Sequence, residues 1–171
     1  MIEKYNAMTS VEQKERTELL ERYDVIMGHF PYGIHTMVSR PSTTISMVRE
    51  PVDRVVSLYE YWRGSHLADD AGPSMKAFMS TNPFGWALKD NHMVRVFCGA
   101  EGFKARNGEL TRAHLEKAKK NMEECAFVGL AEQFDESVSV LQEMYGWKNI
   151  SYTSKNVNKK RKNRNVSTDI D

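Results

Sequence analysis

Two arginines and a serine at helical spacing are the first candidates for chemistry. They lie in the string Arg49-Glu-Pro-Val-Asp-Arg54-Val-Val-Ser57, directly after a short apolar run. Residues three apart share a helix face, so the Arg54 guanidinium and the Ser57 hydroxyl could converge with Arg49 on a phosphate. The alternative is structural, with Arg49 capping a sheet and the other two side chains on a solvated helix face. The residue types alone leave both interpretations open.

Positioning these side chains requires a strand that ends at Arg49 and a helix that begins at Pro51. Residues 43–48 (TTISMV) are uncharged and rich in residues that favour β-strands. Proline suits the first turn of a helix. The apolar residues that follow predict one stripe facing a core: Val52, Val55, Val56 and Tyr59. Ligands of parallel sheets gather where strands end and helices begin, because backbone N–H groups and the helix dipole attract anions there.

The rest of the chain alternates strand and helix patterns. Residues 23–30 (YDVIMGHF) predict a buried strand that delivers a loop at His29, and residues 126–128 predict a further short strand. Helices are expected over residues 10–22, 91–98, 111–124 and 134–145, with loops and short helices over 64–90. This alternation predicts an α/β fold in which a parallel sheet is flanked by helices. The length of 171 residues suits a single domain, 1–171.

Composition narrows the function classes. Hydrophobic residues make up 40% and charged residues 27% of the chain, which is typical of globular proteins. No run approaches the roughly 18 apolar residues of a membrane span, and the first residues lack the apolar run of a signal peptide. We therefore expect a cytoplasmic protein with no membrane partner. Cys98 and Cys125 make no disulfide framework, and no Cys/His spacing suits a metal, so we expect two small buried cysteines and no metal.

The basic C-terminal segment, residues 155–171, differs in charge from the rest of the chain. It holds six basic side chains, which leaves 18 of the 24 basic and 21 of the 23 acidic side chains in residues 1–154. Such a segment can bind nucleic acid or phosphate, or it can be a solvated extension. The sequence has no stacking-aromatic or helix-turn-helix signature, so we expect no nucleic-acid partner.

The string from Ile45 to Tyr59 (ISMVREPVDRVVSLY) resembles the 3′-phosphate-binding motif of sulfotransferases that use 3′-phosphoadenosine 5′-phosphosulfate. The pattern is closest to the carbohydrate (heparan-type) O-sulfotransferase branch, with R-[DE]-P-x-x-R-x-x-S-x-[YW] after a hydrophobic strand. Weaker features follow the order of that family: GHFPYG at 28–33, NHMVRVFCG at 91–99, the helix from Thr111, FVGL at 127–130, FDES at 134–137 and NVNKKR at 156–161. Together they span residues 23–162.

This resemblance implies a P-loop-kinase-like sulfotransferase fold. The implied reaction moves a sulfuryl group from 3′-phosphoadenosine 5′-phosphosulfate to a hydroxyl, releases adenosine 3′,5′-bisphosphate and requires no metal. A carbohydrate is the implied acceptor. The residues that would bind the nucleotide are Arg49, Arg54 and Ser57 at its 3′-phosphate and Lys159, Lys160 and Arg161 in a late loop that closes over it.

His29 is the residue that the resemblance favours as the catalytic base. Sulfuryl transfer needs a group that takes the proton of the acceptor hydroxyl, and histidines commonly do this near neutral pH. In the carbohydrate branch a base histidine lies in a comparable segment at the end of a strand. The alternative is a histidine that only hydrogen-bonds its own loop, and His35 is a weaker candidate for the base.

The family's donor loop has no counterpart in this sequence. Its type is K-[TS]-G-[GST]-[TS], and its lysine and backbone N–H groups hold the 5′-phosphosulfate. We therefore expect a family member that is N-terminally incomplete, without its first strand. Enzymatic activity then depends on whether the loop's contacts are supplied, and the alternative is a noncatalytic nucleotide-binding module or a fragment. The open sheet edge left by a missing strand would favour pairing with a second copy.

Overall fold

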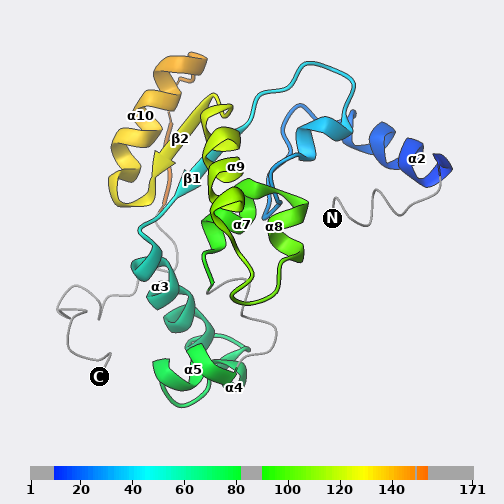
Figure 1. The fold of residues 1–171 in the computed structure, drawn as a ribbon. Helices are drawn as coiled ribbons and strands as arrows, with labels where there is room; N and C mark the ends of the chain where they lie inside the picture. The colour runs from blue at the N-terminus through cyan, green and yellow to red at the C-terminus, as the bar shows by residue number, and fades with distance from the viewer. Residues whose placement is uncertain (1–9, 82–89, 149, 154–171) are drawn as a thin grey trace. The chain divides into compact units, whose positions relative to one another are not determined.

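The computed structural model describes residues 10–81, 90–148 and 150–153. The chain divides into two compact units, one made of residues 1–48 with 90–129 and the other of residues 49–89 with 130–171. In chain order, the described helices (α), 3-10 helices (η) and strands (β) are α2 (Ser10–Leu20), η1 (Ile34–Met37), β1 (Ile45–Val48), α3 (Pro51–Arg63), α4 (Ala68–Ala71), α5 (Met75–Thr81), α7 (His92–Cys98), α8 (Ala100–Lys104), α9 (Arg112–Glu123), β2 (Phe127–Leu130), η2 (Ala131–Gln133) and α10 (Phe134–Tyr145) (Figure 1).

The two strands pair as a small parallel sheet, the only sheet within the described ranges. Just before the strands, the Ala126 N–H donates to the Thr44 carbonyl at 3.0 Å, which helps to set their register. Both strands lie where the sequence predicts them, at 43–48 and 126–128. A mixed α/β class with a small parallel sheet is therefore confirmed. The helices expected over 10–22, 91–98, 111–124 and 134–145 are also present.

Residues 23–30 form no strand, so this prediction is wrong. Val25 is 76% exposed and Met27 is 88% exposed, in a segment predicted to be buried. β-branched and apolar residues favour a strand mainly through packing against neighbouring strands and a covered face. No described strand pairs with this segment. The strand end that was expected to position His29 is therefore absent.

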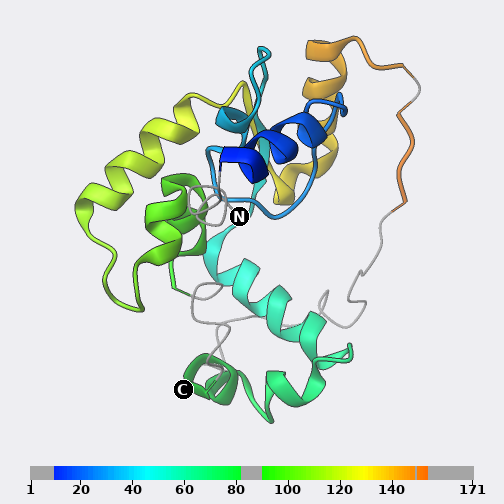
Figure 2. The same cartoon turned by 90° about the vertical axis from the view of Figure 1, so that its right-hand side faces the viewer.

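The core of the first unit lies between α7, α8 and α9, which group together in both views (Figures 1 and 2). Phe97, Cys98 and Ala118 are buried together there. Gly102 allows the close approach of α8 to α7, since a Cβ at this position would lie 2.8 Å from the Arg95 carbonyl oxygen and 2.8 Å from the Cys98 Cβ. Helix α8 itself was not predicted.

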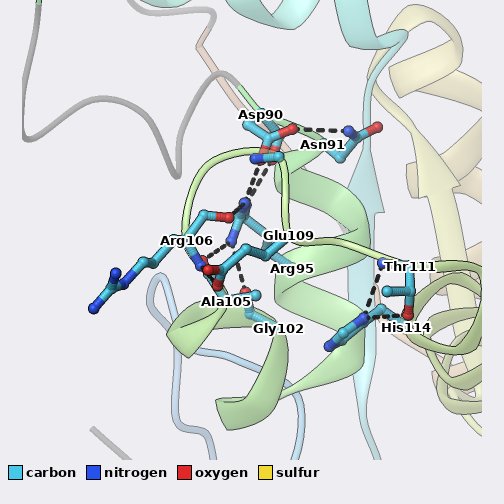
Figure 3. Close-up of polar contacts among 10 residues, drawn as sticks. Asp90, Asn91, Arg95, Gly102, Ala105, Arg106, Glu109, Thr111 and His114 are labelled. Carbon is cyan, nitrogen blue, oxygen red and sulfur yellow. Dashed lines mark hydrogen bonds and ion pairs between the residues drawn. The ribbon is translucent and has the colours of Figure 1, made fainter.

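Arg95 of α7 is completely buried in this unit and is surrounded by hydrogen-bond acceptors (Figure 3). Its guanidinium donates to the Asp90 carboxylate and carbonyl and to three further carbonyls, those of Gly102, Ala105 and Arg106. Burial of a charge is tolerated only when the charge is paired and hydrogen-bonded. Arg95 therefore fixes the path of the chain around α8 and is a structural residue.

The core of the second unit lies between α3, α4 and α5. Its buried residues are Tyr59, Ala71 and Phe78. The side of α3 that packs on this core is made of Val55, Leu58, Tyr59 and Trp62. Val52 is instead 50% exposed, and Val56 is not among the residues that pack on this core, so only Val55 and Tyr59 of the predicted stripe are confirmed.

No helix within the described ranges combines the length and the apolar character that crossing a membrane requires. Both cysteines are free thiols, and Cys98 is buried as expected whereas Cys125 is partly buried. Burial raises the pKa of each thiol, which disfavours the reactive thiolate form.

Candidate anion-binding site at the start of α3

Arg49 lies between the carboxyl end of β1 and the first residue of α3. The start of the helix is locally well defined, because the Glu50 carboxylate accepts a hydrogen bond from the Asp53 N–H at 2.6 Å and Pro51 occupies the first turn. The location of Arg49 is the one that the sequence predicts. A strand end followed by a helix N-terminus is a place where anions are stabilised.

The Arg49 guanidinium faces a carboxylate that the sequence analysis did not identify. Its Nε lies 3.7 Å from Oε1 of Glu132, in η2, and the same oxygen accepts a hydrogen bond from the Glu50 N–H at 3.0 Å. About a third of each side chain is exposed, at 35% for Arg49 and 38% for Glu132. The Arg49 Nε atom itself is buried and has no hydrogen-bond partner among the described residues. One donor of this guanidinium is therefore left unsatisfied.

Arg54 and Ser57 lie on α3 one turn apart, as predicted, and both are partly buried. Partial burial lowers the pKa of Arg54 because desolvation disfavours its charged form. An arginine remains protonated in proteins, so two cationic groups, Arg49 and Arg54, stand in the first two turns of this segment. Their partners in an anion complex would be oxygen atoms of a phosphate.

His29 belongs to the first unit, whereas the arginines and the serine belong to the second. It is exposed and lies in an irregular segment rather than at the end of a strand. His35 is partly buried, and its ring meets that of Tyr32 edge-on at 4.9 Å between centroids. The Tyr32 hydroxyl in turn donates to Glu124 at 2.9 Å, so His35 takes part in a local packing cluster.

The predicted basic residues of the late loop are not described, and the side chains near the end of α3 divide between core and surface. Lys159, Lys160 and Arg161 lie outside the described residues. Of the aromatic residues near the end of α3, Tyr59 and Trp62 pack in the core and Tyr61 is 52% exposed. The Arg63 guanidinium lies 5.5 Å from the centre of the Tyr59 ring, and His66 is exposed.

Glu132 could have been found from the topology. It follows β2 by two residues, and Arg49 follows β1 directly. The carboxyl ends of parallel strands meet at one edge of a sheet, so a residue just beyond one strand can contact a residue just beyond its neighbour. Recognising this contact requires knowing that the two strands are adjacent, which the sequence pattern alone does not state.

Comparisons of the chain with protein-family models, with curated proteins and with solved structures find no match. Within the described ranges, no three His, Cys, Asp or Glu side chains are grouped so that they could hold a metal ion. The groups around the start of α3 that could hold an anion are the guanidinium groups of Arg49 and Arg54 and the hydroxyl of Ser57. This set of donors suits an oxyanion such as a phosphate.

Proposed function

We propose that the chain is a sulfotransferase that moves a sulfuryl group from 3′-phosphoadenosine 5′-phosphosulfate to a hydroxyl, with a carbohydrate as the acceptor. The observation that carries the proposal is Arg49, a guanidinium at a strand end and helix start with a buried Nε that lacks a hydrogen-bond partner among the described residues. The R-E-P-x-x-R-x-x-S spacing of Arg49, Arg54 and Ser57 supports the assignment of this site to the 3′-phosphate.

In the proposed reaction the acceptor oxygen attacks sulfur in line with the donor's bridging oxygen. A new S–O bond forms to the acceptor, the S–O bond to the 5′-phosphate breaks, and the acceptor proton passes to a base, for which we propose His29. Arg49, Arg54 and Ser57 hold the opposite end of the nucleotide. They contribute through positioning, which is a major part of catalysis in group transfers of this kind.

The second candidate function is a nucleotide-binding module without turnover. Two observations favour it: the sequence contains no K-[TS]-G donor loop, and His29 lies in an exposed segment that is not a strand. Such a module would need only the groups around Arg49. It would bind adenosine 3′,5′-bisphosphate without stabilising the charge that develops on the leaving 5′-phosphate.

Calorimetry with adenosine 3′,5′-bisphosphate tests the binding site that both functions share. Arg49→Ala should weaken binding by about 1.5–3 kcal/mol, the usual contribution of a hydrogen bond to a charged group. Ser57→Ala should weaken it less. Arg63→Ala is the matched control, because Arg63 is an exposed arginine at the other end of the same helix. Absence of binding by the wild-type chain at millimolar ligand, or equal binding by folded Arg49→Ala, would contradict the proposal.

A sulfate-transfer assay on the same preparation separates the two functions. Transfer to a carbohydrate hydroxyl from the labelled donor supports the enzyme. Binding of the bisphosphate with no transfer to any hydroxyl acceptor supports the module. A second experiment uses the chain fused to a strand and donor loop of the family type. If the missing loop limits turnover, the fusion should gain far more in transfer activity than in nucleotide affinity.

A further inference from the structure

The carboxylate of Glu132 occupies the position in which an anion bound to Arg49 would be expected. Its Oε1 is 3.7 Å from the Arg49 Nε and accepts from the Glu50 N–H at 3.0 Å. A guanidinium and a backbone N–H at the start of a helix are the donors that proteins also offer to phosphate. The free chain therefore already holds an anion at this place, and that anion is its own side chain.

We propose that Glu132 is an internal competitor for the anion that binds Arg49, and that its carboxylate must withdraw before a phosphate can take its place. The inference rests on the proposed function, because the anion in question is the 3′-phosphate of the nucleotide. A carboxylate and a phosphate cannot share the same guanidinium edge without repulsion between like charges. The affinity for the nucleotide is thus lowered by the free energy that Glu132 gains from Arg49 and Glu50.

Two other acidic residues, Glu50 and Asp53, stand at the start of α3. The Glu50 carboxylate accepts from the Asp53 N–H at 2.6 Å and so completes the helix cap. Asp53 lies in the first turn of the helix. The Glu132 carboxylate forms an ion pair with Arg49. It is therefore the acidic group to change.

The Glu132→Gln variant removes the negative charge and retains an oxygen that can accept from the Glu50 N–H. The local hydrogen bond can therefore persist, and the competition for Arg49 is lost. Glu136→Gln is the matched control: it removes the same charge from an exposed position in the first turn of α10, four residues further along the chain. Thermal unfolding of each variant reports whether the fold is retained.

Calorimetric titrations with adenosine 3′,5′-bisphosphate and with inorganic phosphate measure the effect. Glu132→Gln should bind each about two- to fivefold more tightly than wild type, the range expected for a partly exposed ion pair, and Glu136→Gln should bind like wild type. In a nuclear magnetic resonance titration of the wild type, the Glu50 amide signal should move, because its partner changes from the Glu132 carboxylate to the phosphate.

The outcomes separate this inference from the function on which it rests. If wild type binds the bisphosphate and Glu132→Gln binds it equally or more weakly, Glu132 is no competitor, although the nucleotide site stands. If Glu136→Gln gains as much affinity as Glu132→Gln, the gain comes from the change in net charge alone, and the inference is overturned as well. If neither wild type nor Glu132→Gln binds at millimolar ligand, both the inference and the proposed nucleotide site are wrong.

Discussion

The Arg95 guanidinium donates a hydrogen bond to the Asp90 carboxylate, and no part of the arginine is accessible to solvent. The Asp90 carboxylate also accepts hydrogen bonds from the side-chain amide of Asn91 at 2.9 Å and from the backbone N–H of Gly108 at 3.3 Å. The ion pair therefore joins the residues just before α7 to the turn that follows α8 (Figure 3). The stability of the first unit should depend on it.

Replacing Arg95 by methionine should destabilise the chain by about 3–5 kcal/mol, because the change removes the cationic partner of the Asp90 carboxylate and the donor of several backbone carbonyls. Denaturant unfolding measures the loss. Arg106→Ala is the control: its side chain is exposed and points away from the cluster in Figure 3, so that variant should lie within about 0.5 kcal/mol of wild type. A stable Arg95→Met protein would show that the network has no structural role.

The stability of the chain should fall in acid partly through Asp90. Burial by itself would raise the pKa of this carboxyl, but the hydrogen bonds from Arg95, Asn91 and Gly108 outweigh burial and hold it below its usual value. A carboxyl with a lowered pKa in the folded state contributes stability above its unfolded pKa, and this contribution is lost as the pH falls through the folded pKa. Asp90→Asn should therefore be less stable at neutral pH and show a flatter stability profile below about pH 4. Parallel profiles for the two proteins would refute this.

Tyr32 should ionise at a higher pH than an ordinary tyrosine, because its pKa is raised. Burial, followed by the hydrogen bond to Glu124 and the charge of Glu124, raises its pKa to about 12 from the usual value of 10.0. The neutral phenol is favoured in the folded state, so its contribution to stability is complete below about pH 10 and is lost as the pH rises through 12. An alkaline absorbance titration should show one late phenol that disappears in Tyr32→Phe. A titration curve that keeps its latest step in this variant would assign that step to another tyrosine.

Truncation of two large apolar side chains, Phe78 and Met27, should change the free energy of unfolding by very different amounts. Phe78 is fully buried against the Tyr59 and Trp62 rings, with centroids 5.4 and 5.5 Å away, so Phe78→Ala should cost about 3–5 kcal/mol. Met27 is 88% exposed, and Met27→Ala should change the free energy of unfolding by less than about 0.5 kcal/mol. A large loss at Met27 in thermal or denaturant unfolding would mean that residues 23–30 are covered in solution.

His29→Ala tests the proposed base in any preparation that transfers sulfate. Loss of a general base should lower kcat by roughly 10² to 10⁴, with little change in affinity for adenosine 3′,5′-bisphosphate. His66→Ala is the control, because His66 is likewise an exposed histidine. If His29→Ala retains full kcat, the base lies elsewhere, and the nucleotide site around Arg49 is unaffected by that result.

Local signals predicted the elements that carry the candidate site, and non-local contacts account for what was missed. Pro51 favours the first turn of α3 through its backbone preference, and Glu50 before it caps the helix, so the location of Arg49 followed from sequence. Residues 23–30 have the composition of a strand, but a strand needs a partner, and composition does not supply one. Glu132 pairs with Arg49, which is far away in the chain, and Arg95 donates to backbone carbonyls. Neither kind of contact can be recognised from the pattern of side chains.

The acceptors that Arg95 finds in Gly102, Ala105 and Arg106 are all main-chain oxygens. Every amino acid carries such an oxygen, so the arginine recognises the course of the backbone and is indifferent to the side chains at Ala105 and Arg106. The number of residues between the arginine and these carbonyls is instead critical, since one residue more or fewer would move each oxygen out of reach. Positions 105 and 106 should therefore accept many replacements, whereas the chain between Arg95 and Arg106 should tolerate no change in length.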